Sequence, residues 1–216
     1  MKKITIAILM LLGTFSMASA ELGVNVGVSG SMGIFTAKGN EAMGSTDPGN
    51  GSPYDRAVSP LAMGSLFIEK TLGDYVTVGV DYVPNGIDSE TATQDKACEA
   101  ATCTQTIKVS FDDMTTGYVA LNVTENFYVK AGVIQVDVIS KESLDTGGTY
   151  GNTSMDGTVI AMGYNKELTN GLFVRAEGSY MEFDDISLLA ATGETRTAHA
   201  KDIGGATGKI SIGKSF

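Results

Sequence analysis

The chain has 216 residues, of which 25 are acidic and 15 basic, so its formal net charge is −10 at pH 7. This balance argues against binding to nucleic acid or to anionic lipid headgroups, since both need clustered Lys and Arg. No stretch approaches 18 consecutive apolar residues, which excludes a helical membrane protein. No motif predicts a cofactor, and no spacing of His, Cys or acidic residues predicts a metal site.

The first twenty residues have the layout of an export signal. Lys2 and Lys3 form a short basic region, residues 4–12 are a largely apolar run, and Ala18-Ser19-Ala20 supplies small residues at the usual cleavage spacing. The run has about half of the ~20 residues that a membrane-spanning helix needs. We therefore expect residues 1–20 to be a cleaved signal peptide and residues 21–216 to form one domain.

The chain contains two cysteines, Cys98 and Cys103. In an exported protein the expected state of such a pair is a disulfide. Closing so short a loop contributes ~2 kcal/mol at most, so the bond would stiffen a loop rather than hold the fold together. A metal or redox pair is normally spaced C-x-x-C, which makes those interpretations weaker.

After the export signal, apolar and polar residues alternate with a period of two, which is typical of β-strands. In residues 22–34 the apolar face is Leu22, Val24, Val26, Val28, Met32 and Ile34, and the other face is small and uncharged. A small polar face of this kind suits a narrow enclosed interior. We expect eight such segments: 22–34, 61–69, 75–82, 107–123, 128–138, 160–165, 172–180 and 206–216.

The connections between these segments alternate in length. Short links lie at 71–74, 124–126 and 169–171, whereas the long ones, rich in Gly, Ser, Thr, Asp and Asn, lie at 39–57, 84–104, 141–157 and 189–201. An even-stranded membrane barrel with both termini on one side requires this sorting. The prediction is an all-β chain folded as a closed antiparallel eight-stranded transmembrane β-barrel with up-and-down topology, since only a closed sheet satisfies its backbone in hydrocarbon.

Two finer patterns accompany the strands. Up to Val133 the apolar residues of segment 128–138 lie on one face, and from there on Ile134, Val136 and Val138 lie on the other. This parity switch predicts a bulge or an end projecting beyond the membrane. Aromatic residues fall near segment ends, as interfacial girdles would: Phe67, Tyr75, Phe127, Tyr164, Phe173 and Phe216 at the turn side, and Tyr82, Phe111 and Tyr180 toward the loops.

The chain resembles the small outer-membrane β-barrel superfamily, which comprises the OmpA transmembrane domain, OmpX, OmpW and the opacity-type porin family. The sharpest element is the alternating ending 209–216, which finishes on Phe216; Lys214 departs from the usual apolar residue. The resemblance implies a Gram-negative outer membrane location and lipid and lipopolysaccharide as surroundings. It also implies that barrel-assembly machinery reads Phe216 as the assembly signal. Both termini are expected in the periplasm.

Seven charged residues fall on faces expected to point into the barrel: Glu69, Asp81, Asp112, Lys130, Arg175, Glu177 and Lys209. Eight strands leave an interior that side chains just fill, so we expect these residues to form an ion-paired plug. The alternative is a polar conduit for small solutes.

We expect no enzymatic activity. The lone histidine, His199, lies in a long loop, and no serine at strand spacing supplies a nucleophile for it. The expected function is that of a non-enzymatic integral barrel that supports the outer membrane and presents loops to surface ligands. The alternative is a narrow porin-like channel for small or hydrophobic solutes.

Overall fold

The computed structural model describes residues 23–43, 54–84, 86–89, 92–97, 102–143, 150–189 and 196–216. Eight long strands make up the body of the molecule: β1 (Val24–Met43), β2 (Asp55–Leu72), β3 (Val76–Val83), β6 (Thr102–Asn122), β7 (Phe127–Ser143), β8 (Thr153–Glu167), β9 (Leu172–Phe183) and β11 (Arg196–Ser215). The shorter elements are β4 (Ile87–Asp88), β5 (Ala92–Ala97), β10 (Ile186–Leu189) and the 3₁₀ turn η2 (Thr169–Gly171).

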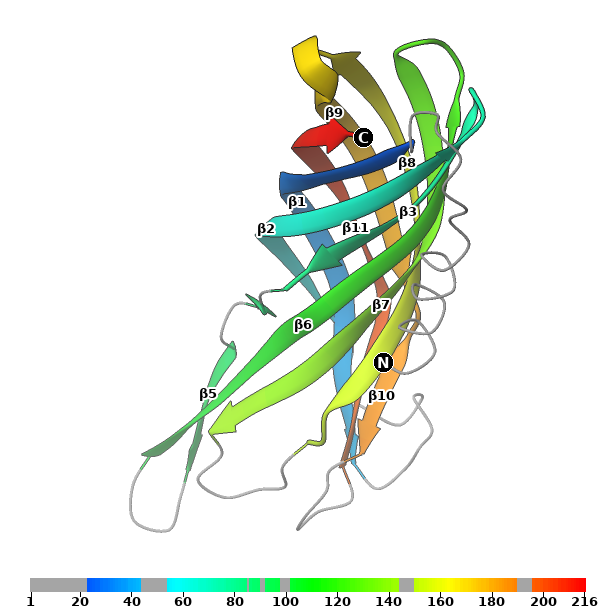
Figure 1. Ribbon diagram of the computed structural model, residues 1–216. Helices are drawn as coiled ribbons and strands as arrows, with labels where there is room; N and C mark the ends of the chain where they lie inside the picture. The colour runs from blue at the N-terminus through cyan, green and yellow to red at the C-terminus, as the bar shows by residue number, and fades with distance from the viewer. Residues whose placement is uncertain are drawn as a thin grey trace.

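The long strands form a closed ring of antiparallel hydrogen bonds, as predicted. Each strand pairs with its neighbours in the order β1-β2-β3-β6-β7-β8-β9-β11, and β11 returns to β1 with Asn25 opposite Ser215. Figure 1 shows the resulting barrel, with the tight turns at the top and β5 and β10 at the bottom. Closure by β11 leaves neither terminal strand with a free edge along the ring.

The strands are longer than the sequence pattern predicts. The expected loop 84–104 contains β4, β5 and the start of β6, and the expected loop 189–201 contains the start of β11. The sequence of these stretches lacks the apolar alternation that marks a membrane-crossing strand, while the backbone pairing continues. The strands therefore project past the membrane on the loop side.

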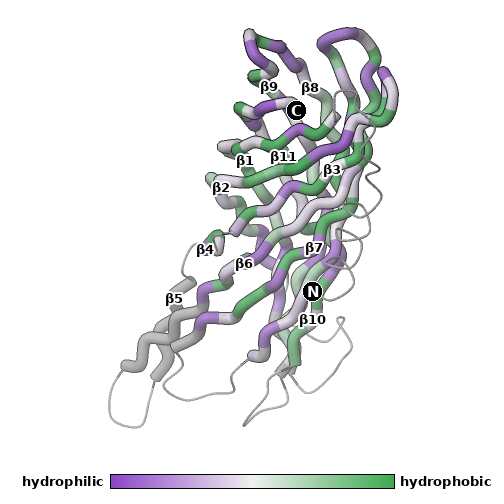
Figure 2. Tube along the Cα trace, in the orientation of Figure 1, coloured by the Kyte–Doolittle hydropathy of each residue, from purple (hydrophilic) through white to green (hydrophobic). Residues whose placement is uncertain are grey.

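The outer surface over most of the barrel is apolar. Met32, Val133, Ile160, Met162 and Ile210 are each more than 60% exposed. An exposed apolar surface of this extent in water would be an aggregation liability, whereas in lipid it is the required solvent face. Figure 2 shows the alternation of hydrophobic and hydrophilic residues along the strands that produces it.

The interior changes character along the barrel axis. Toward the turns it contains charged and hydroxyl side chains, and toward the loops it contains a cluster of buried apolar residues centred on Ile134, Val136 and Val138, which are 1–2% exposed. On β7 the alternation itself is regular, while β6 opposite shifts register between Asp112 and Thr115. The parity switch in the sequence of β7 therefore marks a level along the barrel axis. At this level the apolar residues of the strand change from the lipid-facing side to the interior side.

Three of the predicted girdle aromatics, Phe67, Phe111 and Phe173, were assigned to the wrong face, and Phe111 packs against the buried apolar cluster. Phe67 and Phe173 are only 6% and 2% exposed and lie with their rings 6.2 Å apart inside the barrel. Tyr75, Phe127 and Phe216 are more than half exposed at the turn side, where a girdle belongs. A ring packed inside the barrel needs space on the neighbouring strand, and this is what places glycines opposite these aromatics.

Some predictions concern residues that the structure does not describe. Residues 1–22, including the expected signal peptide, and Cys98 lie outside the described residues, so cleavage and the Cys98–Cys103 disulfide stay predictions. Within the described residues, no helix is long and apolar enough to cross a membrane.

Candidate functional site

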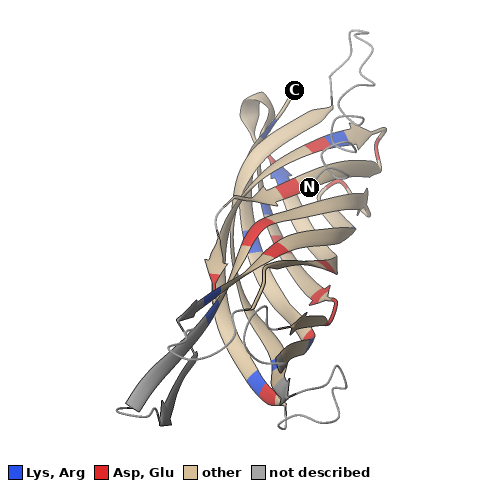
Figure 3. Cartoon of the chain, turned by 90° about the horizontal axis from the view of Figure 1, so that it is seen from below, with Lys and Arg blue, Asp and Glu red and all other residues tan. Residues whose placement is uncertain are grey.

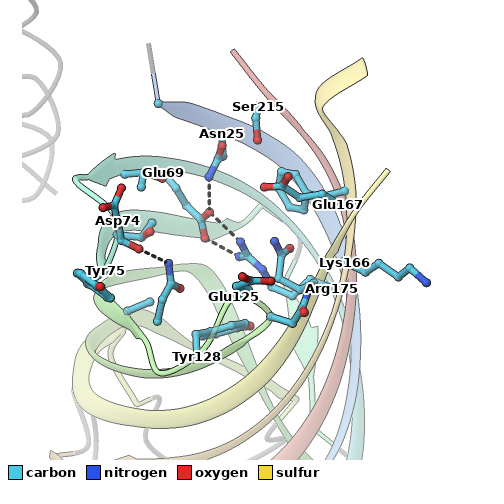
Figure 4. A pocket seen from close by; sticks show the side chains of 18 of the residues that line it. Asn25, Glu69, Asp74, Tyr75, Glu125, Tyr128, Lys166, Glu167, Arg175 and Ser215 are labelled. Atoms are coloured by element: carbon cyan, nitrogen blue, oxygen red, sulfur yellow. Dashed lines mark hydrogen bonds and ion pairs between the residues drawn. The ribbon is translucent and has the colours of Figure 1, made fainter. Parts of the chain in front are cut away.

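A polar vestibule of about 1180 Å³ opens at the turn side of the barrel. Its rim includes Asp74, Asn122 and Glu167, and its floor is built around Glu69 and Arg175. Figure 4 shows the floor in close-up, with Asn25, Glu69 and Arg175 pointing toward one another from different strands. The vestibule therefore ends on charged side chains in the middle of the barrel.

Glu69 is the centre of the first part of this floor. Two nitrogens of the Arg175 guanidinium donate to its two carboxylate oxygens at 2.6 and 3.0 Å. The Tyr118 hydroxyl donates at 2.7 Å and the Asn25 amide at 3.3 Å. Glu69 is 2% exposed, so these donors replace the water that a buried carboxylate loses.

Glu177 is the centre of the second part. It accepts a hydrogen bond of 2.5 Å from the Lys130 ammonium and one of 2.6 Å from the Tyr128 hydroxyl. Lys209 forms a further ion pair with Asp81 at 2.8 Å. Three acids and three bases thus balance within the floor. Figure 3 shows acidic and basic residues interspersed along the strands.

The structure brings together six of the seven charged residues singled out from the sequence. The seventh, Asp112, lies apart from them on the loop side, where its carboxylate accepts a hydrogen bond of 2.6 Å from Ser110. The register shift of β6 beside Asp112 changes the face on which this part of the strand presents its side chains.

Two equivalent cross-strand triplets hold the glutamates. In one, Gly79 on β3 separates Glu69 on β2 from Tyr118 on β6, and the tyrosine ring crosses the glycine to reach the carboxylate. The second triplet follows the same rule with Tyr128 on β7, Gly163 on β8 and Glu177 on β9. A side chain at either glycine would overlap the tyrosine ring.

The two bases lock the triplets to each other. Arg175 pairs with Glu69 of the first triplet and lies 5.1 Å from the ring centroid of Tyr128 in the second. Lys130 pairs with Glu177 of the second triplet and lies 4.7 Å from the ring centroid of Tyr118 in the first. Each cation therefore has an anion and an aromatic face as partners within the floor.

Neither the two tyrosines nor the two glycines were predicted as site residues from the sequence. The sequence signal for them is a Tyr at an inward-facing position with a Gly at the inward-facing position opposite it on the neighbouring strand. That signal depends on the strand register, which the sequence pattern does not specify to a single residue.

On the loop side of the charged floor lies a second, apolar cavity of about 150 Å³. Its walls come from β1, β2, β4, β6, β7, β8, β9 and β11, and they are almost entirely carbon and sulfur: Phe35, Ala37, Ala57, Leu61, Met63, Ile87, Phe111, Met114, Val136, Met155, Phe183 and Ile203. We call this cavity the apolar chamber. A cavity of this size, lined by apolar side chains, has room for a molecule such as benzene.

The barrel wall beside the apolar chamber is incomplete. Pairing between β1 and β2 continues to Asp55, whereas pairing between β2 and β3 stops at Leu66 opposite Tyr82. Among the described residues, β2 therefore has no backbone partner on its β3 side from residue 55 to 65. Pro60 lies in this stretch, which suits an edge because proline donates no hydrogen bond. Its neighbour Ile34 is 60% exposed on the apolar outer surface, so the edge begins at lipid level.

The expectation that His199 lacks a serine partner was wrong. The Ser187 hydroxyl lies 2.8 Å from Nδ1 of His199, because β10 pairs with β11 and sets these residues opposite each other. The other ring nitrogen, Nε2, is buried without a hydrogen-bond partner among the described residues. An acyl-transfer base needs a group that stabilises its imidazolium form, and the described residues supply none at Nε2. Likewise, no cluster of three potential metal ligands occurs in the described part of the chain.

No protein-family model matches the chain, and no curated protein matches it. Among solved structures, the outer membrane protein OprG from Pseudomonas aeruginosa is similar at 13% identity with a TM-score of 0.55, covering 92% of this chain and 98% of OprG. Neisserial surface protein A is similar at 10% identity and a TM-score of 0.43 (92% and 100% covered). The outer membrane protease OmpT from Escherichia coli is similar at 11% identity and a TM-score of 0.46 (93% and 99% covered).

Of these three likenesses, the one to OprG is strong enough to carry an argument, and it concerns the fold. The closed antiparallel ring and the apolar outer face agree with it. The chain is therefore an outer-membrane β-barrel in fold, of the small eight-stranded kind. Its interior is divided into a polar vestibule, a charged floor and an apolar chamber.

Proposed function

We propose that this protein is a non-enzymatic integral barrel of the bacterial outer membrane that admits a small apolar molecule into the apolar chamber. The observation that carries the proposal is the chamber itself, an apolar cavity inside a membrane barrel, beside an interrupted stretch of wall. A barrel that served only as a membrane support would gain stability from filling this cavity. This proposal develops the alternative function predicted from the sequence, a narrow porin-like channel, in its form for hydrophobic solutes.

The charged floor favours a route through the side of the barrel over a route along its axis. An apolar molecule passing to the vestibule would have to separate Glu69 from Arg175 and Glu177 from Lys130, all largely buried. The unpaired edge of β2 instead connects the chamber with the apolar outer surface. We infer that the molecule enters from the loop side and leaves toward the lipid.

A planar-bilayer recording tests the closed floor. We expect no steady, discrete single-channel currents from the purified wild-type protein, because the six paired charges leave no continuous water path along the axis. Regular currents from the wild type would contradict the plug and would favour an axial channel for small solutes.

Ligand binding tests the chamber. Fluorobenzene, a probe of the expected size, should show saturable ¹⁹F line broadening with the protein in lipid nanodiscs. Ala37 lines the chamber, and we expect Ala37→Phe to abolish the saturable component because the added ring fills the space. The matched control is Ala206→Phe, which places the same ring on the exposed outer face of β11. Equal broadening in both variants would mean that the probe reports lipid partitioning only.

The remaining expectations belong to the same proposal. Export by the signal peptide, assembly through Phe216, both termini in the periplasm and a bridged Cys98–Cys103 pair are what an outer-membrane barrel of this topology calls for. The long loops would then face the cell exterior, where they are available to surface ligands and to lipopolysaccharide.

A further inference from the structure

The short strand β4 completes the wall of the apolar chamber next to the free edge of β2. Its backbone pairs only with β6, where Ile87 lies opposite Phe111 and Asp88 opposite Ser110. Ser89 continues this attachment with a 2.8 Å hydrogen bond from its N–H to the carbonyl of Val109. Among the described residues, backbone pairing joins β4 to β6 and none joins it to β2.

The two residues of β4 face opposite ways. Ile87 packs against the buried apolar cluster and lines the chamber, across from Ala57 and Leu61 of β2. Asp88 points to the other side of the strand. Moving β4 outward would therefore open the chamber between β2 and β6 without disturbing any pairing of the eight-stranded ring.

Asp88 attaches β4 to the loop-side ends of both β6 and β7. Its two carboxylate oxygens lie 2.5 Å from the Lys108 ammonium and 3.0 Å from the Lys141 ammonium. Lys108 and Lys141 are directly opposite each other in the β6–β7 ladder. Two like charges in such positions repel each other, and the carboxylate between them offsets that repulsion.

The ionic attachment is accessible to solvent, unlike the pairs of the charged floor. The side chains of Lys108, Asp88 and Lys141 are 34%, 39% and 50% exposed. Hydrogen bonds from Lys108 and then Lys141 hold the pKa of the Asp88 carboxyl well below its usual range. A lowered carboxyl pKa means that the attachment is complete above the usual value and is lost as the pH falls through the lowered one. Salt, rather than mild acid, is therefore what weakens it.

We propose that β4 is a movable wall of the apolar chamber, latched by Asp88 to Lys108 and Lys141, and that releasing the latch opens the chamber to its ligand at the free edge of β2. The part of the proposal that concerns the ligand rests on the proposed function. The movement of β4 does not, and it is measured without ligand.

The chain contains no Trp, so a single introduced Trp is its only indole fluorophore. In an Ile87→Trp variant, acrylamide quenching reports the exposure of β4. We expect weak quenching at low salt, several-fold stronger quenching at about 1 M NaCl, where the Debye length is about 3 Å, and no change on acidification to about pH 5. Adding Asp88→Asn should produce the strong quenching already at low salt.

A matched control is Asp202→Asn, which removes a second exposed ion pair, that with Lys38 at 2.8 Å between β11 and β1, strands that do not pair with β4. It should leave the quenching unchanged. A Leu61→Trp variant repeats the measurement from β2 in case Trp at position 87 disturbs folding. If adding Asp88→Asn leaves the quenching of both reporters unchanged, the proposal is overturned.

Ligand binding separates the two proposals. If β4 moves as expected, Asp88→Asn should raise the rate of fluorobenzene exchange several-fold while Asp202→Asn leaves it unchanged. A quenching response without saturable fluorobenzene binding would retain the movable wall and reject the proposed function. Binding with salt-independent quenching would retain the function and reject the latch.

Discussion

Replacement of Arg175 by Met is expected to lower the free energy of unfolding by about 3–5 kcal/mol. The substitution keeps much of the side-chain volume but leaves Glu69 with its charge and without its bidentate partner. The Glu69 side chain is 1% exposed, so water cannot replace the guanidinium without rearrangement. Because the pair borders the open vestibule, we expect the loss at the lower end of this range. Urea unfolding followed by far-UV circular dichroism and by the gel mobility of the folded barrel measures it.

The control for this prediction is the double variant Glu69→Gln/Arg175→Met. Removing both charges abolishes the uncompensated carboxylate, so the double variant should be more stable than Arg175→Met alone. The amide introduced by Glu69→Gln still has the Tyr118 hydroxyl and Asn25 within reach. A loss below about 1 kcal/mol for Arg175→Met would show that Glu69 behaves as a surface carboxylate.

The second large effect is expected at Gly163, where replacement by Ala should cost about 1–3 kcal/mol. The new Cβ would overlap the ring and hydroxyl of Tyr128. Tyr128 would have to move, and its hydrogen bond of 2.6 Å to the buried Glu177 would be lost. The same urea unfolding experiment measures the change.

Gly178 provides the matched control. It lies on β9, opposite Met162 of β8, and a Cβ at this position meets no atom within 4 Å. Gly178→Ala should therefore leave the barrel as stable as the wild type or slightly more stable, since alanine restricts the unfolded chain. Equal destabilisation by both substitutions would point to a general strand effect and reject the specific role of Gly163.

These effects share one origin, which is the division of the barrel interior along its axis. Near the turns the interior is polar and the surface apolar, so buried charges must find partners across the lumen. Near the loops the interior is apolar and the outward residues include Asp156 and Glu182. The loop-side part is thus organised like a small water-soluble barrel placed on a membrane-spanning one. The proposed chamber lies in that part, on the loop side of the charged floor.

Local information in the sequence was enough to predict the ring of eight strands. The period of two depends only on the alternation of side chains along an extended chain, and the short links are defined by a few turn residues such as Asn170 and Gly171, both with positive φ. The parity switch at Ile134 could also be predicted from the sequence, because it too depends only on alternation along one strand. Where both faces are polar, as in the projecting part of β6, the local pattern no longer distinguishes strand from loop.

Only the tertiary structure decided which residues meet. Arg175 and Glu69 are 106 residues apart and sit on strands that are not neighbours, so their pairing depends on the stagger with which the barrel closes. The apolar chamber likewise draws its lining residues from several strands, with the largest shares from β1 and β2. Among the described residues, β2 has a free edge because β3 ends at Val83 while β2 continues. Alternation along one strand determines which side of the wall a residue faces. Which residue it meets across the lumen depends on its position along the barrel axis, and that position is set only when the barrel closes.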